Sequence, residues 1–182
     1  MALALAGCPS PDPATGLGTT QPPDQFLDYN QFVCAVEPVL IKRCSFLACH
    51  GNATHAFRVY SLGKLRIGDP TTRKARSFDL LSADEVERNF ESASGMVYGT
   101  AAGDRTPTPV VNKVTLLLKP LKAAFGGSEH HGVGVFPAFP ATTLDDDGEW
   151  QSLVAWVGGA AQPKPVDAKC QALFDAMSLA PR

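Results

Sequence analysis

Residues 43–51 read RCSFLACHG, and this stretch decides how the rest of the chain is interpreted. Two cysteines, the second followed directly by a histidine, form the pattern that attaches a c-type haem: both sulfurs bond to the porphyrin and the histidine binds the iron. The usual spacing is C-x-x-C-H, whereas four residues separate Cys44 from Cys49 here. Because the Cys-His adjacency is kept, we predict one covalent haem c held by Cys44, Cys49 and His50.

Three other interpretations of these residues stay open: a structural zinc site, a Cys44–Cys49 disulfide, and two unrelated buried thiols. Structural zinc is held by four Cys or His ligands in a tetrahedron, and no second CxxC or HxxxH run is present to complete such a set. A Cys44–Cys49 disulfide would leave the adjacent His50 without a role. The haem interpretation accounts for all three residues.

Length and composition indicate one mostly α-helical domain with long irregular loops. The chain has 182 residues, of which 45% are hydrophobic, so it can bury one substantial core. Fifteen prolines and sixteen glycines favour short helices over a regular bundle. The net charge of −2 provides no basic footprint for nucleic acid. We therefore expect no nucleic-acid partner.

The N-terminus is typical of an exported lipoprotein. Residues 5–8 read LAGC, which is similar to a bacterial lipobox in which Cys8 becomes the lipidated first residue, although the usual basic region before it is missing. The alternative is a short disordered terminus with an incidental cysteine. We divide the chain into a signal remnant (1–8), a flexible Pro- and Thr-rich tether (9–24) and one folded domain (25–182). No run is long enough to span a bilayer, so we expect attachment by lipid alone, in the periplasm or at the cell surface, with the outer membrane favoured.

Apolar periodicity and capping residues predict the main elements of the domain. Helices are expected over 26–43 with an interruption at Pro38, from a Ser82–Glu85 capping box to Gly95, over 149–157, and over 166–179. Acidic residues 145–147 are expected to cap the third of these helices. A short strand or extended segment is expected at 57–61, and a short buried helix or extended segment at 110–121.

Cys34 and Cys170 are left over from the haem and lipid motifs, and both lie on predicted amphipathic helices. In an oxidising compartment, two such cysteines are best paired with each other. A bridge would pin the C-terminal helix to the first helix and stabilise the fold by on the order of 4 kcal/mol in the chain-entropy model.

Several segments resemble a family of secreted bacterial cytochromes c, the planctomycete-type cytochrome c domains. Residues 32–40 (FVCAVEPVL) match its F-x3-V-x-P-[IV]-L opening before the haem motif, and residues 89–90, 115–121 and 153–160 resemble later segments. The resemblance covers most of residues 26–160, and the C-x4-C-H spacing departs from the family pattern. It implies a cytochrome c-like helical haem domain in which the 149–157 helix packs across the first one. The 166–179 helix lies outside it.

The same resemblance implies a sixth iron ligand in a glycine-flanked loop, residues 126–136 (GGSEHHGVGVF). The family's histidine falls on His130, with His131 as the alternate and Met96 after it. Met177 is a weaker candidate because its helix stripe is explained by packing. Two histidine ligands are expected to give a low-spin iron at a lower potential than a His/Met pair.

These observations predict a monohaem cytochrome that transfers electrons at the bacterial cell envelope to an unidentified redox partner protein. We see no nucleophile, base and orienting group in combination, so an enzyme is not expected. The alternatives are a subunit of a larger multi-haem assembly with other cytochromes, a haem sensor or peroxidase-like protein, and a non-haem metal-binding lipoprotein. Arg66 or Arg58 is expected to pair with a haem propionate.

Overall fold

The computed structural model describes residues 27–67, 80–98, 114–128, 134–138, 140–158 and 168–179. These residues are mostly helical, and within them the only β-type pairing is an isolated parallel bridge between Leu121 and Phe136. No helix in the described ranges has the length and hydropathy to cross a bilayer. The expected mostly α class is confirmed at this level. The elements are α1 (Tyr29–Gln31), η1 (Phe32–Val36), α2 (Glu37–Arg43), α4 (Ala83–Tyr98), α5 (Thr115–Leu118), η3 (Ala123–Phe125), α6 (Gly148–Val157) and α7 (Ala168–Ala176).

The expected first helix is three consecutive elements rather than one regular helix. Asp28 caps α1 by accepting a hydrogen bond from the Gln31 N–H at 2.8 Å. The backbone then widens into the π-helical turn η1, and α2 begins with Pro38 in its first turn. Proline has no N–H to donate to the preceding turn, and its ring crowds the carbonyl four residues earlier. The interruption expected at Pro38 is therefore present as a π turn followed by a new helix.

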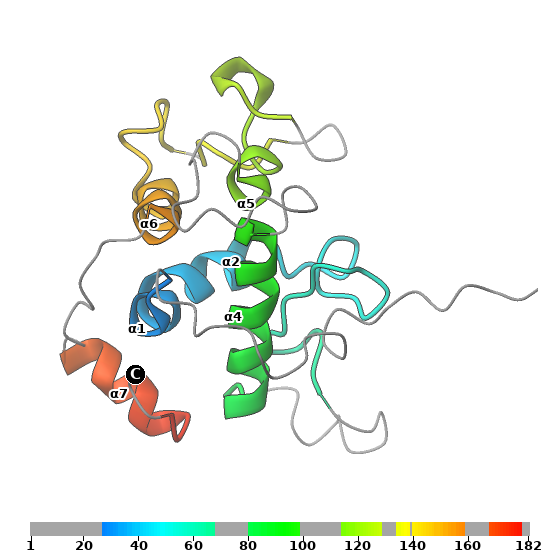
Figure 1. Ribbon diagram of the computed structural model, residues 1–182, viewed down its shortest axis with the longest axis vertical. Helices are drawn as coiled ribbons and strands as arrows, with labels where there is room; N and C mark the ends of the chain where they lie inside the picture. The colour runs from blue at the N-terminus through cyan, green and yellow to red at the C-terminus, as the bar shows by residue number, and fades with distance from the viewer. Residues whose placement is uncertain are drawn as a thin grey trace, which may run out of the picture.

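The core is built where α4 and α6 meet α1 and η1 from different sides. Trp156 of α6 is fully buried, its ring 5.3 Å from that of Phe32, and its indole N–H donates to the Asp28 carbonyl at 3.0 Å. Phe90 of α4 packs edge-on against Tyr29 and Phe32, with ring centroids 5.2 and 5.3 Å away. Figure 1 shows α4 to the right of α1, with α6 above α1 and α7 below it. The late helix α6 thus contacts the first helical segment, as expected.

Helix α4 starts as predicted but ends later. The capping box is present: the Glu85 N–H donates to the Ser82 hydroxyl at 3.3 Å, and the Ser82 N–H donates to the Glu85 carboxylate at 2.9 Å. The predicted end at Gly95 is wrong, because α4 continues to Tyr98 and carries Met96 inside it. A glycine in a helix costs only about 1 kcal/mol. Val97, one turn after the buried Ala93, lies on the apolar face, and its burial outweighs that cost.

The shorter segments and the two C-terminal helices agree with the sequence only in part. Of the two options for residues 57–61, the strand is not formed, and the segment has no regular secondary structure. Of residues 110–121 the structure describes 114–121, in which the short buried helix option is present as α5, followed by a turn at 119–120 and the isolated bridge at Leu121. Asp147 caps α6 as expected, accepting hydrogen bonds from the Glu149 and Trp150 N–H groups at 3.0 Å each. The C-terminal helix ends earlier than predicted, because α7 spans Ala168–Ala176; residues 166–167 of the prediction lie outside the described ranges.

The predicted disulfide between Cys34 and Cys170 is present. It joins η1 to α7, with the two Cα atoms 5.4 Å apart. Phe174 of α7 is fully buried and lies 6.3 Å from the Tyr29 ring between centroids. The bridge therefore attaches the last described helix to the first one across a packed aromatic contact.

Candidate functional site

Residues 44–51, where the sequence predicts haem attachment and which we call the attachment loop, begin at the C-terminus of α2. The Cys44 N–H donates to the Leu40 carbonyl of α2 at 2.8 Å. The loop then closes on itself, because the His50 N–H donates to the Cys44 carbonyl at 3.0 Å, and the Cys49 and Gly51 N–H groups donate to the Phe46 carbonyl at 2.8 and 3.0 Å. The four-residue spacing thus forms a compact turn that brings the backbones of Cys44 and His50 together. In Figure 1 the loop and the segment after it lie beside α4, on the side away from α7.

Gly51 is required by the packing of this turn. A Cβ atom at Gly51 would overlap the backbone carbonyl of Ser45. Ser45 is itself fully buried, and its hydroxyl donates to the Ile41 carbonyl of α2. Because the obstructing atoms belong to the backbone and not to a flexible side chain, they cannot move aside without opening the turn.

We predict that Gly51→Ala opens the attachment loop and destabilises the protein by on the order of 2 kcal/mol, as overpacking against rigid atoms does. Urea unfolding monitored by circular dichroism would measure the loss. Gly95→Ala is the matched control, since a Cβ atom there meets nothing within 4 Å, and it is expected to be neutral or stabilising. Equal stability of the two variants would contradict the argument.

His50 is held in the orientation that a metal-binding imidazole needs. Its Nδ1 lies 2.8 Å from the Phe57 carbonyl oxygen, and the Phe57 ring packs 4.6 Å from the imidazole between centroids. A carbonyl can only accept, so Nδ1 is the protonated nitrogen and Nε2 carries the lone pair. A backbone carbonyl on one ring nitrogen is the usual support for a histidine that binds metal through the other.

Cys44 and Cys49 are both reduced thiols in this structure. Burial, reinforced by the nearby Cys49, raises the pKa of the Cys44 thiol to about 12. A thiol that stays protonated at neutral pH oxidises slowly, because the thiolate is the reactive form. Cys49 is exposed beside His50. The alternative Cys44–Cys49 disulfide is therefore not formed here, and the two sulfurs stay available for bond formation.

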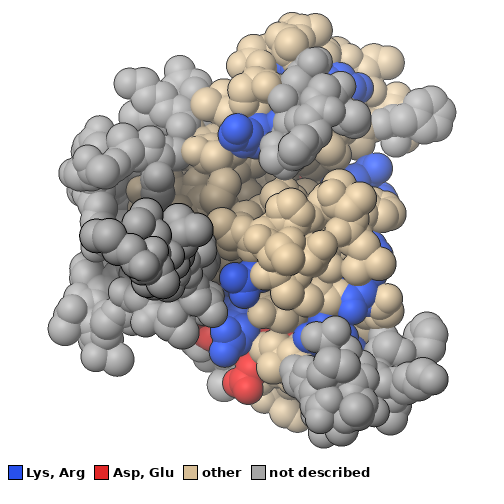
Figure 2. Space-filling view, turned by 90° about the vertical axis from the view of Figure 1, so that its right-hand side faces the viewer, with Lys and Arg blue, Asp and Glu red and all other residues tan. Residues whose placement is uncertain are grey.

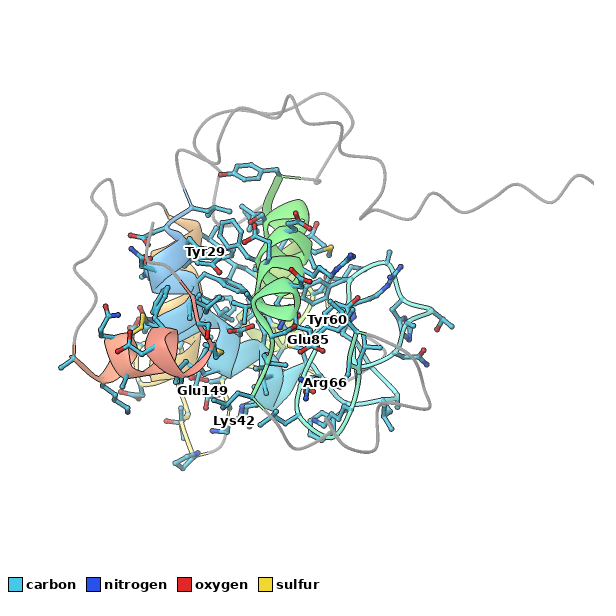
Figure 3. The ribbon with its side chains drawn as sticks, turned by 90° about the horizontal axis from the view of Figure 1, so that it is seen from below. Tyr29, Lys42, Tyr60, Arg66, Glu85 and Glu149 are labelled. Carbon is cyan, nitrogen blue, oxygen red and sulfur yellow. A yellow bond between two sulfur atoms is a disulfide. The ribbon has the colours of Figure 1, made fainter. Side chains whose placement is uncertain are left out.

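Of the two residues expected to pair with a haem propionate, Arg66 is bound to a protein carboxylate instead, and the Arg58 Nε donates to the His55 carbonyl at 2.7 Å. The Arg66 side chain is buried and bound to Glu85 through two hydrogen bonds of 2.8 Å, with a third to the Leu80 carbonyl at 3.1 Å. Burial pushes the pKa of Glu85 upward, but hydrogen bonds from Arg66 and from the Ser82 and Ile67 N–H groups outweigh it, so the pKa lies below its ordinary value. Figure 3 shows Arg66 and Glu85 together, near Tyr60. The ion pair binds the segment after the attachment loop to α4.

A buried carboxyl that we did not predict lies at the start of α2. Glu37 is only 2% exposed, and its Oε1 accepts a hydrogen bond from the Asn89 amide at 2.8 Å. Burial raises the pKa of Glu37 to about 7; the Asn89 hydrogen bond lowers it and the nearby Glu85 charge raises it further. The signal in the sequence is that Glu37 stands four residues after Val33 and three before Leu40, on the apolar face.

This burial makes stability depend on pH with a defined sign. The unfolded chain releases the Glu37 proton near the ordinary pKa of 4.5, whereas the folded protein holds it up to about 7. The folded state therefore binds more protons between these values. The contribution of Glu37 to stability is full below pH 4.5 and is lost as the pH rises toward 7.

We predict that Glu37→Gln, which cannot ionise, raises the free energy of unfolding at pH 8 by up to about 3 kcal/mol relative to wild type, and has little effect near pH 4.5. Urea unfolding at both pH values would measure the difference. Glu149→Gln is the control. Glu149 pairs with Lys42 and Arg43. Partial burial raises the pKa of Glu149, but these two partners outweigh it and hold the pKa below its ordinary value. Glu149→Gln should therefore destabilise the protein. A Glu37→Gln effect that is the same at both pH values would disprove the mechanism.

The other predicted ligands are only partly visible. His130, His131 and Cys8 lie outside the described residues. Met96 is half-buried against the core on α4, and Met177 is buried just after α7, so packing accounts for both. In the described part of the chain, no three His, Cys, Asp or Glu side chains are grouped to hold a metal ion.

The two ends of the predicted ligand loop, residues 126–136, which we call the histidine loop, are held close to one another. A Cβ atom at Gly127 would overlap the Leu121 carbonyl, and one at Gly134 would overlap the Lys122 side chain. Leu121 and Phe136 also form the isolated bridge, and the Lys122 N–H donates to the Phe136 carbonyl at 3.0 Å. The glycines that flank the histidines therefore allow two backbone stretches to pack in direct contact.

The face that carries the attachment loop is shown in Figure 2. On it, more Lys and Arg than Asp and Glu side chains are visible, and the surface is hollowed between the upper part of the molecule and the segment around the loop. The loop presents Phe46 and Leu47 to solvent, 53% and 62% exposed. The Lys64 ammonium lies 4.1 Å from the Phe46 ring centroid and donates to the Ser45 hydroxyl at 2.9 Å.

The site therefore brings together Cys44, Cys49 and His50, supported by Phe57, next to an apolar and basic surface. Reasoning from the sequence found the first three and missed the support from Phe57. Comparison with protein-family models, curated proteins and solved structures finds no match to this chain.

Proposed function

We propose that this chain is a monohaem c-type cytochrome that transfers electrons at the bacterial cell envelope. The observation that carries the proposal is the geometry of the attachment loop. Two reduced cysteines flank a turn that ends in His50, and the hydrogen bond from His50 to the Phe57 carbonyl leaves Nε2 as the metal-binding nitrogen. A mostly helical fold in which α6 packs across the first helical segment is consistent with a cytochrome c-like domain.

Each residue of the loop has a defined role in this proposal. Cys44 and Cys49 hold the porphyrin through thioether bonds, and His50 is the proximal ligand. The bound haem supplies an iron that gains and loses one electron, while the protein sets its potential and its access to partners. The exposed Phe46 and Leu47 and the ammonium of Lys64 lie beside the cysteines. They form the surface that a redox partner protein would meet.

The test is expression of the full chain in a bacterium with haem-attachment machinery. The purified protein is expected to give a c-type pyridine haemochrome spectrum, and acid–acetone extraction is expected to leave the colour on the polypeptide. Extraction of the colour, or a bare chain by mass spectrometry, would overturn the proposal. Zinc found at one equivalent in a colourless protein would favour the structural zinc alternative.

We propose His130 as the sixth ligand, with His131 and then Met96 as alternates. The proposal is supported by the two ends of the segment that carries the histidines, because Gly127 and Gly134 pack closely against residues 121–122. We predict that His130→Ala converts a low-spin iron to high-spin or opens it to added imidazole, and that wild type lacks the absorption band of methionine-bound haem. A low-spin spectrum that survives both His130→Ala and His131→Ala would move the ligand to Met96.

The proposed location is outside the cytoplasm, with a lipid on Cys8 as the anchor and the outer membrane as the favoured membrane. The Cys34–Cys170 disulfide supports an oxidising compartment, because such bridges persist there and are rare in the cytosol. Membrane fractions that lose the protein after Cys8→Ala would support lipid attachment. A wild-type protein that is soluble and retains Met1 would contradict it.

A further inference from the structure

The segment 57–60 connects His50 to the interior of the fold. At its first residue, the Phe57 carbonyl accepts the hydrogen bond from the His50 ring, and the Val59 N–H donates to the His50 carbonyl at 2.8 Å. At its last residue, Tyr60 is buried against α4. The position of the imidazole therefore depends on what holds Tyr60.

Asn89 of α4 holds Tyr60 from both sides of its backbone. The Tyr60 N–H donates to Asn89 Oδ1 at 2.7 Å, and Asn89 Nδ2 donates to the Tyr60 carbonyl at 3.0 Å. The side-chain amide thus pairs with the Tyr60 backbone as a neighbouring strand would. Asn89 Nδ2 also donates to Glu37 Oε1 at 2.8 Å. Both donor hydrogens of the amide are used, one on the His50 side and one on Glu37.

Glu37 is the titratable member of this chain of hydrogen bonds. From α4, the charged group that acts on it is Glu85, which is itself paired with Arg66 from the segment after the loop. From residues 57–60, the neighbouring titratable groups are Arg58 and Tyr60, and the Arg58 Nε donates to the His55 carbonyl. Lys42 and Arg43, at the other end of α2, pair with Glu149. Arg66, Arg58, Lys42 and Arg43 each bind a protein oxygen other than that of Glu37. The Glu37 carboxyl contacts the neutral amide of Asn89.

We propose that Glu37 is a proton-binding positioning residue for His50, acting through Asn89 and the backbone of residues 57–60. The ionised carboxylate binds the Asn89 N–H through a charge-assisted hydrogen bond, which is stronger than the bond to a neutral acid. Proton uptake by Glu37 therefore weakens the support of Tyr60, and with it the support of the Phe57 carbonyl that orients His50.

This inference rests on the proposed haem function for its redox consequence. An electron delivered by the partner protein adds negative charge near His50, which favours transfer of one proton from solvent to the Glu37 carboxylate. One electron and one proton enter together, and both leave when the next partner takes the electron. Uptake of a proton with the electron makes the midpoint potential fall as the pH rises through the titration of Glu37.

The first experiment needs no haem and uses the full chain as isolated. The Tyr60 backbone amide is followed by ¹H–¹⁵N NMR between about pH 5 and 9, a range that brackets the Glu37 titration. We expect a shift with its midpoint near pH 7 in wild type and none in Glu37→Gln, whose amide still offers an acceptor to Asn89. Ser94→Ala is the matched control, since this buried hydroxyl on α4 has no hydrogen-bond partner, and it should titrate like wild type.

The second experiment measures the midpoint potential of the haem-loaded protein over the same pH range. We expect the potential to fall with rising pH in wild type and in Ser94→Ala, and to be independent of pH in Glu37→Gln. A Tyr60 shift that persists in Glu37→Gln, a flat Tyr60 titration in wild type, or an unchanged potential profile in Glu37→Gln would each overturn the assignment. A chain that takes up no haem would refute the proposed function, and the Tyr60 titration would still decide the role of Glu37. An infrared carboxylic-acid band that wild type loses between about pH 6 and 8 would support the assignment without any variant.

Discussion

Under the proposed function, replacing Cys44 and Cys49 together with serine is expected to abolish covalent haem binding in a strain that has haem-attachment machinery. A serine hydroxyl does not replace the thiol in forming the thioether bond, so neither end of the turn could hold the porphyrin. His50 would keep its hydrogen bond to the Phe57 carbonyl, because that bond involves neither sulfur. The effect is all-or-none, since one imidazole alone retains haem only by reversible coordination.

The two single variants separate the roles of the cysteines. Cys49 is exposed, whereas the Cys44 thiol is buried against the end of α2, with its pKa raised to about 12 by burial and by Cys49. We expect each single variant to retain some haem through one thioether, with Cys44→Ser lowering the yield of folded protein more. Haem staining after denaturing electrophoresis and intact-protein mass spectrometry would measure both outcomes.

The control is the pair Cys34→Ser with Cys170→Ser, which removes two cysteines from the same chain without touching the attachment loop. This variant should still carry covalent haem in whatever fraction folds. The attachment would lie elsewhere if the control lost covalent haem while Cys44→Ser/Cys49→Ser still stained for haem as wild type does. Covalent haem surviving in the double loop variant would do the same.

Removal of the Cys34–Cys170 disulfide is expected to lower the free energy of unfolding by about 4 to 5 kcal/mol. The two cysteines are 136 residues apart in the sequence. A bridge across so long a loop removes many conformations from the unfolded chain, and the chain-entropy model assigns stabilisation of this size to it. Native proteins are stable by only about 5 to 15 kcal/mol, so this loss is a large share of the total.

The measurement is urea unfolding of wild type and of Cys34→Ala/Cys170→Ala. Phe174 of α7 is fully buried, and its packing on the first helical segment is expected to be retained in the variant at low denaturant. Adding a reductant should bring wild type to the stability of the variant and should leave the variant unchanged. A wild-type protein whose unfolding is insensitive to reductant would show that the bridge contributes little.

Signals confined to a few neighbouring residues predicted the structure well. The Ser82–Glu85 capping box, the Asp147 cap of α6 and the break at Pro38 are all present. In each case, the donor and acceptor, or the missing donor, lie within four residues of one another, so the local backbone decides the outcome. The Cys34–Cys170 pairing followed from a different argument, because in a chain with few cysteines the number of possible partners is small.

Predictions that depended on competition between local preference and packing were less accurate. Gly95 was expected to end α4, yet the buried face that includes Val97 extends the helix to Tyr98. Residues 57–61 have weak β-type alternation but form no strand. The Tyr60 backbone pairs instead with the Asn89 side chain. The preference of a single residue is worth about 1 kcal/mol or less, and burial of a large apolar side chain exceeds it.

The sequence by itself determined which side chains the attachment loop presents: Cys44, Cys49 and His50 are close in the chain, so they lie in one turn, which follows the C-terminus of α2. Only the tertiary structure decided what surrounds that loop. Arg66, which the sequence offers together with Arg58 as a propionate partner, pairs with Glu85. Glu37 is a buried acid bound to Asn89, a residue 52 positions away in the chain, and the sequence analysis does not predict this contact. Whether a charged side chain meets solvent or a partner is set by elements that pack from distant parts of the chain, because the cost of burying a charge depends on the whole surrounding volume.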